Sequence, residues 1–226
     1  MTDHAFNAQE RAAVYRAIAE RRDMRHFAGG EVPPEVLARL LEAAHHAPSV
    51  GLMQPWRFLR IRDPQLREAA HALVEAERVR TAEALGERSD EFMRLKVEGI
   101  RDCAELLAVA LMEGREAHIF GRRTLPEMDM ASVACAIQNL WLAARAEGLG
   151  VGWVSLFVPE AVAGDWEAAA GYEASLAYAR DRSQGRPVRD RGQGTSHDAS
   201  GSGIHLTGRW PGTRATGAVV LRTGGR

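Results

Sequence analysis

Residues 131–157, ASVACAIQNLWLAARAEGLGVGWVSLF, contain the pattern that decides the fold. Apolar side chains recur at helical spacing over 131–147 and predict a helix. Gly148 follows that helix and suits a left-handed cap. Residues 151–157 are again rich in apolar side chains and predict a buried strand. A helix that leads directly into a buried strand implies a mixed fold, in which helices cover a sheet.

The chain before this segment repeats both kinds of pattern. Residues 106–112 form an unbroken apolar run, which is typical of a central strand with both faces covered. Residues 56–61 predict a shorter strand. Helices are predicted at 10–22, from Pro34 to Pro48, at 65–85, and from Ser89 or Asp90 through Gly99. Together these elements predict helices packed on both sides of a small sheet.

Alternate glycines mark the link between the helix and the strand, in the run Gly148-Leu149-Gly150-Val151-Gly152. A dinucleotide-binding loop also carries spaced glycines, but it follows a strand and opens a helix. The order here is the reverse, so we reject a dinucleotide-binding loop. We expect the glycines to permit a close approach of another backbone, and Ser155 to emerge near the end of the strand.

Three arginines, Arg21, Arg22 and Arg25, lie within five residues at the end of the first predicted helix. Planar guanidinium groups suit phosphate binding, and three of them could converge on one phosphate. Cations are also favoured at any helix C-terminus. Considered alone, this second explanation is the better one.

The ten residues at 47–56, APSVGLMQPW, connect a helix to a strand. Two prolines, a glycine, a hydroxyl and an amide give this loop a defined shape. It could hydrogen-bond a planar polar ligand, and an ordinary connection explains it equally well.

Taken in order, five segments resemble the nitroreductase-like flavin family over residues 8–158. They are ERAAVYRAI, RRDMR, APSVGLMQPW, LKVEGI and QNLWLAARAEGLGVGWVS. Ordinary members of the family have a pattern like RRSxR at the arginine motif. They carry an Asn in the motif that corresponds to APSVGLMQPW. Here Asp23 and SVGLMQPW occupy those places, and this pairing resembles a narrower branch that breaks down flavin.

The resemblance implies an α+β fold with a mostly antiparallel central sheet, as an intertwined homodimer that binds FMN between its subunits. It implies an oxidoreductase that takes reduced FMN as substrate and fragments it with O2. The products would be 5,6-dimethylbenzimidazole, the lower ligand of cobalamin, and erythrose 4-phosphate. No metal is implied. A separate flavin reductase would supply the reduced FMN, and the enzyme would act in the cytoplasm.

The resemblance also implies roles for single residues. Asp23 would lie near the flavin and the oxygen, where a carboxylate could steer the oxygen chemistry or move protons. Ser155 matches a second catalytic position, whose hydroxyl could donate or relay a proton. Flavin contacts are implied for these two residues and for Arg21, Arg22, Met24, Arg25, Ser49, Met53, Gln54, Lys96 and Leu106.

The C-terminal part departs from the resemblance, and two units are predicted. Residues 1–163 form the flavin-binding domain, and 164–226 form an atypical tail rich in Arg and Gly. Residues 179–226 hold nine Arg and three Asp without an apolar period. Disorder, an arginine-rich arm and a reading frame other than the native one all remain open. The run GAVVL at 217–221 is too short and too displaced to replace the family's next core strand, so we expect an unpaired sheet edge.

Composition excludes several classes of protein. The 226 residues carry a formal charge of −1, which argues against nucleic acid as the main partner. Cys103 and Cys135 lie far apart, so neither a disulfide scaffold nor a metal-ligand spacing is indicated. The first residues lack the apolar core of a signal peptide. No stretch reaches the ~20 apolar residues that span a bilayer, so a membrane is not expected as a partner.

Other polar or aromatic residues have structural explanations. His45 and His46 are consecutive, so on a helix they diverge by about 100° and cannot form a paired metal site. Asp129 precedes a helix and is expected to assist its N-terminus. Trp141 has helical spacing and is expected in the core.

Two alternative functions remain open beside flavin fragmentation. One is an NAD(P)H-dependent nitro- or flavin reductase of the same fold, which would conserve its flavin. The other is an arginine-tailed nucleic-acid- or flavin-binding module.

Overall fold

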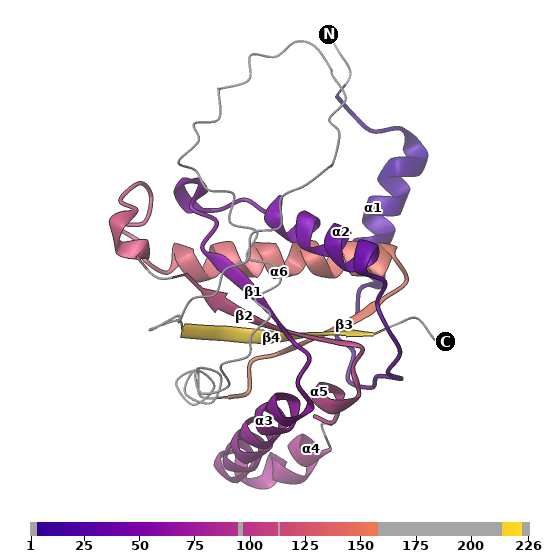
Figure 1. Cartoon of the computed structure of the whole chain (residues 1–226), viewed down its shortest axis with the longest axis vertical. Coiled ribbons are helices and arrows are strands. Elements are labelled where there is room, and N and C mark those ends of the chain that lie inside the picture. The colour runs from indigo at the N-terminus through magenta and orange to yellow at the C-terminus, as the bar shows by residue number, and fades with distance from the viewer. Residues whose placement is uncertain (1–3, 95–96, 113, 158–213, 223–226) are drawn as a thin grey trace.

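The structure is a computed structural model, which describes residues 4–94, 97–112, 114–157 and 214–222. An antiparallel sheet lies at its centre, with helices on both faces (Figure 1). The helices are α1 (Ala8–Glu20), α2 (Pro34–His45), α3 (Pro64–Leu85), α4 (Ser89–Met93), α5 (Gly99–Asp102) and α6 (Met128–Ala146). The strands are β1 (Trp56–Ile61), β2 (Glu105–Leu111), β3 (Gly150–Val154) and β4 (Arg214–Arg222). Short 3₁₀ turns are η1 (Val50–Leu52), η2 (Gly86–Arg88) and η3 (Arg115–Ala117).

Strand β2 is the centre of the core, and all its residues are buried. Leu107, Val109 and Leu111 belong to the apolar cluster that contains residues of α2 and α6. Leu106 and Ala108 belong to the cluster that contains residues of α3 and α5. Successive side chains of a strand point to opposite faces, so a strand covered on both faces must be apolar except where a polar group is paired, as Glu105 is with Arg60. The prediction from the unbroken apolar run is confirmed.

Helices α2 and α6 pack against each other over one face of the sheet (Figure 1). Helix α2 buries an apolar stripe formed by Leu37, Leu40, Leu41 and Ala44. Burying one leucine side chain contributes roughly 1.5–3 kcal/mol, so this contact is a main source of stability. Helix α6 starts three residues before the predicted 131 and ends one residue before 147.

Strand β4 corrects the expectation for the C-terminal part of the chain. Residues 217–221, set aside as too short, lie inside a nine-residue strand. The strand order is β1-β2-β4-β3, so β4 pairs with β2 on one side and with β3 on the other. The predicted unpaired edge at this place is therefore wrong. The boundary at 163 and 164 and most of the tail lie outside the described residues, and the explanations offered for the tail stay predictions.

Helix α1 begins with a capping box at Asn7, which the sequence analysis did not identify. Val14 and Ile18 are four residues apart and share one face of α1, but that face is not buried. Their exposed fractions are 44% and 50%, and that of Tyr15 is 68%. Within the described residues, this apolar face therefore has no cover.

The helix predicted to run through Gly99 is two short helices, α4 and α5. Gly99 begins α5 instead of ending a helix. A Cβ atom at Gly99 would lie 2.6 Å from the ring of Phe27. The glycine is needed for this contact between α5 and the segment that follows α1.

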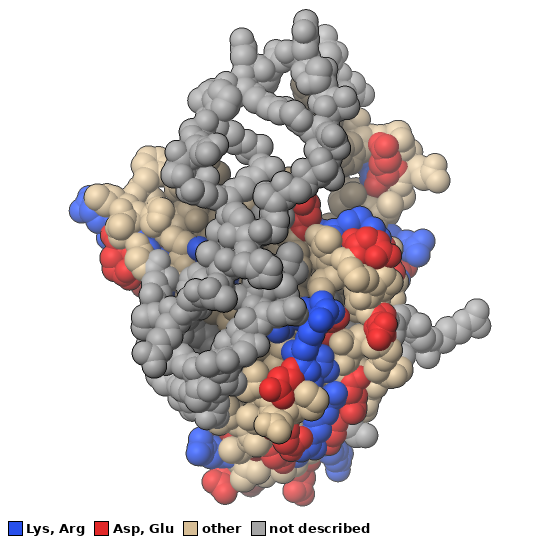
Figure 2. Space-filling model, in the orientation of Figure 1, with Lys and Arg blue, Asp and Glu red and all other residues tan. Residues whose placement is uncertain are grey.

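Acidic and basic side chains are interspersed at the α3–α4 end of the face seen in Figure 2. Ion pairs explain part of this pattern, such as Arg80 with Glu77 and Arg101 with Glu68. Exposed pairs of this kind contribute at most about 1 kcal/mol each. None of the described helices is long and apolar enough to cross a membrane.

Candidate active site

The segment after α1 runs beside β3, and two glycines make this possible. The Met24 N–H donates to the Val151 carbonyl oxygen at 2.9 Å. A Cβ atom at Gly152 would lie 2.4 Å from the Met24 carbonyl oxygen, and one at Gly150 would lie 2.8 Å from the Met24 side chain. The glycines thus permit a close backbone approach, as predicted from their spacing.

The Asp23 carboxylate is held at both oxygens. Its Oδ1 accepts a hydrogen bond from the Trp153 backbone N–H at 3.1 Å. Its Oδ2 lies 2.5 Å from Nη2 of Arg25. The side chain of Asp23 is 34% exposed, so the carboxylate has a fixed orientation and still reaches solvent. Such a group can accept or hold a proton for a molecule bound beside it.

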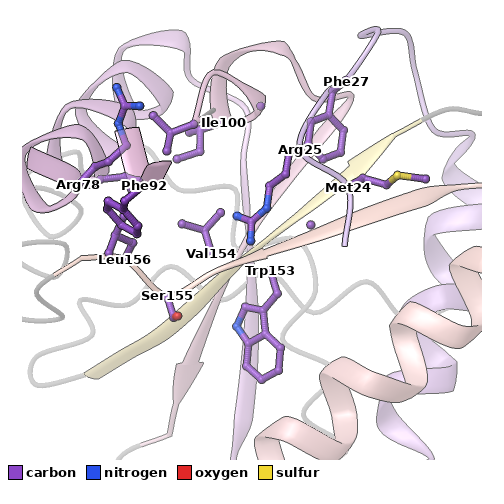
Figure 3. Close-up of a pocket in the computed structure, with 14 residues that line it drawn as sticks. Met24, Arg25, Phe27, Arg78, Phe92, Ile100, Trp153, Val154, Ser155 and Leu156 are labelled. Atoms are coloured by element: carbon purple, nitrogen blue, oxygen red, sulfur yellow. The ribbon is translucent and has the colours of Figure 1, made fainter. Parts of the chain in front are cut away.

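A cavity of about 160 Å³ opens next to this segment (Figure 3). Met24, Arg25 and Phe27 form one wall with the end of β3, and residues of α3, α4 and α5 form the other. The polar lining residues are Arg25, Arg78 and Ser155, and most of the remaining wall is apolar. An apolar cavity with a few fixed polar groups suits a small planar molecule with a polar edge.

Ser155 is the first residue after β3, because the strand ends at Val154 and not at 157 as predicted. Its side chain lies at the cavity (Figure 3). Asp23 stands directly behind the wall, since its two partners, Arg25 and Trp153, both line the cavity. The structure thus places Ser155 at the first cavity, whereas Asp23 is not among the lining residues and is linked to the cavity through Arg25 and Trp153.

The three arginines do not meet at one point within a single chain. Arg21 and Arg22 line a second cavity of about 190 Å³, and Met24 lines both cavities. The guanidinium carbon of Arg21 lies 4.5 Å from the centre of the Trp141 ring. Arg22 donates to two carbonyl oxygens at the end of α1, which is the helix-end role left open above. Trp141 is buried, which confirms its expected place in the core.

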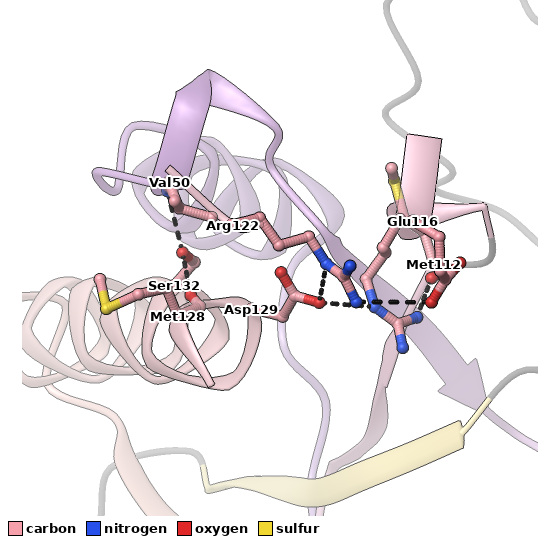
Figure 4. Close-up of polar contacts among 8 residues, drawn as sticks. Val50, Met112, Glu116, Arg122, Met128, Asp129 and Ser132 are labelled. Atoms are coloured by element: carbon pink, nitrogen blue, oxygen red, sulfur yellow. Dashed lines mark hydrogen bonds and ion pairs between the residues drawn. The ribbon is translucent and has the colours of Figure 1, made fainter. Parts of the chain in front are cut away.

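Ser49, Met53 and Gln54 lie in the turn around η1, and Val50 of this turn lies near the N-terminal end of α6 (Figure 4). The Ser49 hydroxyl accepts from the Gln54 backbone N–H at 3.0 Å. The Gln54 amide donates to the His45 carbonyl oxygen at 3.1 Å. Neither cavity described above includes these residues. They form one turn, but not one site with Asp23 of the same chain.

The last two predicted flavin contacts are placed differently. Leu106 is 1% exposed and belongs to the same apolar cluster as Ile100, which lines the first cavity. The Leu106 side chain thus supports the cavity wall from behind. Lys96 lies outside the described residues, and its role stays a prediction.

Arg78 lines the first cavity and was missed from the sequence. It lies 2.6 Å from Glu75 and donates to the Met93 carbonyl oxygen at 2.8 Å, so it ties α4 to α3. The hydrogen bond between the two side chains raises the pKa of Arg78 and lowers the pKa of Glu75. The available signal was the spacing of Glu75 and Arg78, an i, i+3 charge pair on the predicted helix.

Asp129 requires a correction. It lies in the first turn of α6, but no side-chain bond caps that helix. Its buried Oδ2 accepts from Nε of Arg115 at 3.0 Å and from Nε of Arg122 at 2.7 Å. The carboxylate thus joins α6 to the loop before it, instead of assisting the helix N-terminus.

The histidines are separated as expected from their consecutive positions. The His45 ring meets the Trp56 ring edge-on, with 6.3 Å between the centroids. His46 lies 3.3 Å from Glu42, one helical turn earlier. Over residues 4–94, 97–112, 114–157 and 214–222, no cluster of three or more His, Cys, Asp or Glu side chains could hold a metal. Burial raises the pKa of Cys103 to about 11, which makes that thiol unreactive at neutral pH.

The antiparallel sheet with helices on both faces is the architecture of a known family. The sequence pattern of the Nitroreductase family matches residues 18–179, so the chain belongs to the nitroreductase family. Two relatives carry a more particular name, 5,6-dimethylbenzimidazole synthase. The one from Rhodospirillum rubrum is 45% identical over 144 residues, which are 63% of this chain and 68% of the relative. The one from Rhodobacter capsulatus is 39% identical over 159 residues, which are 70% of this chain and 77% of the relative.

Solved structures share the fold. A BluB-like flavoprotein from Clostridium difficile 630 has a TM-score of 0.61 at 16% identity, covering 98% of this chain and 91% of the other. Oxidized iodotyrosine deiodinase bound to FMN and 3-iodo-L-tyrosine has a TM-score of 0.63 at 19% identity, covering 94% and 90%. The expected nitroreductase-like α+β fold is thereby confirmed.

Proposed function

We propose that the chain is a 5,6-dimethylbenzimidazole synthase, which fragments reduced FMN with O2 and releases 5,6-dimethylbenzimidazole and erythrose 4-phosphate. The observation that carries this proposal is the carboxylate of Asp23, which stands at the position where ordinary family members have a serine. Two groups orient it behind an apolar cavity. The names of the two relatives support the same activity.

The lining of the cavity fits a flavin as substrate. Phe27 and Leu156 suit an aromatic ring system, and the guanidinium of Arg25 suits its polar edge. The volume of about 160 Å³ is below the ~300–1,000 Å³ of typical ligand pockets. One chain therefore supplies only part of the site. Reduced FMN brings the electrons that O2 accepts, and the protein supplies orientation and proton transfer.

Asp23 and Ser155 act as the catalytic residues under this proposal. The Asp23 carboxylate, fixed by Arg25 and by β3, holds or moves a proton beside the bound ring. The Ser155 hydroxyl donates or relays a proton at the same cavity. The binding residues are Arg21, Arg22, Met24, Arg25, Ser49, Met53 and Gln54.

A homodimer completes the site under this proposal. The turn with Ser49 and Gln54 lies away from the cavity of its own chain, and large apolar side chains beside it are exposed. The exposed fraction is 70% for Leu52 and 85% for Phe120. Exposed apolar surface of this kind marks interaction sites. We assign the turn of one copy to the cavity of the other, with the open face of α1 as a further part of the interface.

The remaining partners follow from the proposed chemistry. O2 is the co-substrate, and a separate flavin reductase in the cytoplasm supplies the reduced FMN. Neither a metal nor a second organic cofactor takes part in the proposed reaction.

Product formation tests the proposal. The full-length protein is incubated with an excess of chemically reduced FMN in air, and 5,6-dimethylbenzimidazole is measured by chromatography. We expect product from the wild type and about 10²–10⁴-fold less from Asp23→Asn, because a positioned proton-transfer group is lost. FMN binding should change little. The matched control is Asp102→Asn, which removes an exposed carboxylate elsewhere.

Wild-type protein that oxidises NAD(P)H, keeps its flavin intact and yields no 5,6-dimethylbenzimidazole would contradict the synthase. That result, together with activity that survives Asp23→Ser, would identify the nitro- or flavin reductase instead.

A further inference from the structure

The turn that contains Ser49, Met53 and Gln54 has a strained backbone. Leu52 has a φ of 53° and Gln54 a φ of 50°, both in the left-handed region that disfavours side chains. Residues in such conformations cost about 1–3 kcal/mol each and persist only where the surroundings hold them. Something outside the turn must therefore fix its shape.

A first external contact comes from Ser132 on α6. Its hydroxyl accepts a hydrogen bond from the Val50 N–H at 3.0 Å and donates one to the Met128 carbonyl oxygen at 2.6 Å (Figure 4). Ser132 is buried, and both bonds are at least partly buried. The hydroxyl thus fixes the start of η1 against the first turns of α6.

A second external contact comes from the loop that precedes α6. A Cβ atom at Gly51 would lie 2.7 Å from the Phe120 carbonyl oxygen, and one at Gly121 would lie 2.8 Å from Cγ2 of Val50. The loop therefore rests directly on the turn, with a glycine on each side. Its position limits the shapes that the turn can adopt.

The loop itself is held by Asp129, one turn before Ser132 on α6. Arg115 and Arg122, both from the loop, bind the same oxygen of Asp129 (Figure 4). The exposed fractions are 5% for the Asp129 side chain, 17% for Arg115 and 15% for Arg122. Hydrogen bonds between charged groups in such surroundings are stronger than those at the surface. Glu116 also pairs with Arg122, but at 3.4 Å and with a side chain that is 72% exposed.

We propose that Asp129 and Ser132, with Arg115 and Arg122, form a brace that holds the turn in the shape that binds flavin. Asp129 and Ser132 are then positioning residues, which act through the turn and do not touch the substrate. This inference rests on the proposed function, because it takes the turn as a flavin contact. It adds residues that neither the arginine motif nor the turn motif contains.

The test compares FMN binding and turn mobility in variants of the full-length protein. The dissociation constant of oxidised FMN is measured by flavin fluorescence, and amide exchange at 50–54 by hydrogen–deuterium exchange. We expect Asp129→Asn and Ser132→Ala to raise the dissociation constant about tenfold, as for the loss of one hydrogen bond. Exchange at 50–54 should become faster. Ser132→Thr keeps a hydroxyl and should restore both values.

The matched control is Glu116→Gln, which removes the exposed partner of Arg122 and leaves Asp129 in place. It should bind FMN like the wild type. At saturating reduced FMN, the rate of 5,6-dimethylbenzimidazole formation by Ser132→Ala should stay near that of the wild type, since Asp23 and Ser155 are untouched.

Wild-type FMN affinity in Ser132→Ala overturns the brace, whether or not the amides exchange faster. An equal loss in Glu116→Gln also overturns it, because the effect then comes from the loop charges in general. Wild-type protein that binds FMN but forms no 5,6-dimethylbenzimidazole overturns only the proposed synthase, because the binding comparison still decides the brace.

Discussion

The two regions assigned to flavin binding are held in different ways. The segment with Asp23 is held by backbone against backbone, through Met24 and two glycines of β3. The turn with Ser49 and Gln54 is held by side chains that arrive from α6 and from the loop before it. Both regions contain glycines with no room for a Cβ atom, but only the second depends also on buried charge and on one hydroxyl. Alanine substitutions at the glycines should therefore show how much each region depends on its close contacts.

The largest effect is expected from Gly152→Ala. The new Cβ would lie 2.4 Å from the Met24 carbonyl oxygen. This oxygen belongs to the backbone, which cannot change rotamer to make room as a side chain can. Because the segment with Asp23 must shift, we expect 5,6-dimethylbenzimidazole formation to fall at least about 10²-fold. Gly150→Ala is the control, since its Cβ meets only the flexible Met24 side chain. Equal rates for both alanine variants would show that the backbone contact does not position the carboxylate.

A smaller effect is expected from Gly121→Ala, at the turn. Its φ is 74°, and the added Cβ would lie 2.8 Å from the Val50 side chain. Strain and crowding should lower the free energy of unfolding by about 1–3 kcal/mol and weaken FMN binding. Gly114→Ala has the same kind of backbone, with φ of 66° and no neighbour within 4 Å. If the two variants bind FMN equally, the contact of Gly121 with Val50 of the turn plays no part in FMN binding.

The smallest effect is expected from Glu75→Gln. This change weakens the ion pair with Arg78, the residue that lines the first cavity and joins α3 to α4. The Arg78 hydrogen bond lowers the pKa of Glu75 below its ordinary value of 4.5. A carboxyl group with a lowered pKa adds stability that is complete above 4.5 and is lost as the pH falls through the lowered value. We expect urea unfolding at pH 7 to show a loss of less than about 1 kcal/mol, because Glu75 is partly exposed.

That difference between wild type and Glu75→Gln should shrink as the pH falls below 4.5. The control is Glu77→Gln. It breaks an ion pair with Arg80 on the same helix, and neither residue lines the cavity. A loss for Glu75→Gln that does not change with pH would rule out the ion pair as its cause.

Periodicity was sufficient to predict the elements that pack in the core. The bounds of β1 and the buried run of β2 follow from apolar patterns. The spacing of apolar residues along a strand shows whether one or both of its faces are buried. The close backbone approach at Gly152 was also accessible, since spaced glycines after a helix have few other uses. Each of these signals lies within a few residues.

The brace could not be predicted in the same way. Arg115 and Arg122 precede Asp129 by 14 and 7 residues in a loop without a repeating pattern. An acidic residue at a helix start has a simpler local explanation, which the buried ion pairs override. Strand β4 was missed for a related reason, because its partners are distant in sequence and its apolar core is only five residues long. The placement of Ser49 and Gln54 opposite a second copy stays a prediction.

The position of β4 has a consequence for how the chain reaches its native state. Among the described strands, the one that lies between β2 and β3 comes after both of them in the sequence. Until it is available, β2 and β3 each have an open row of backbone donors and acceptors, and no direct ladder joins them. Contacts between residues far apart in sequence slow folding and leave such rows open to other chains. Among the described strands, the sheet can therefore close only after the segment that contains β4 has been made.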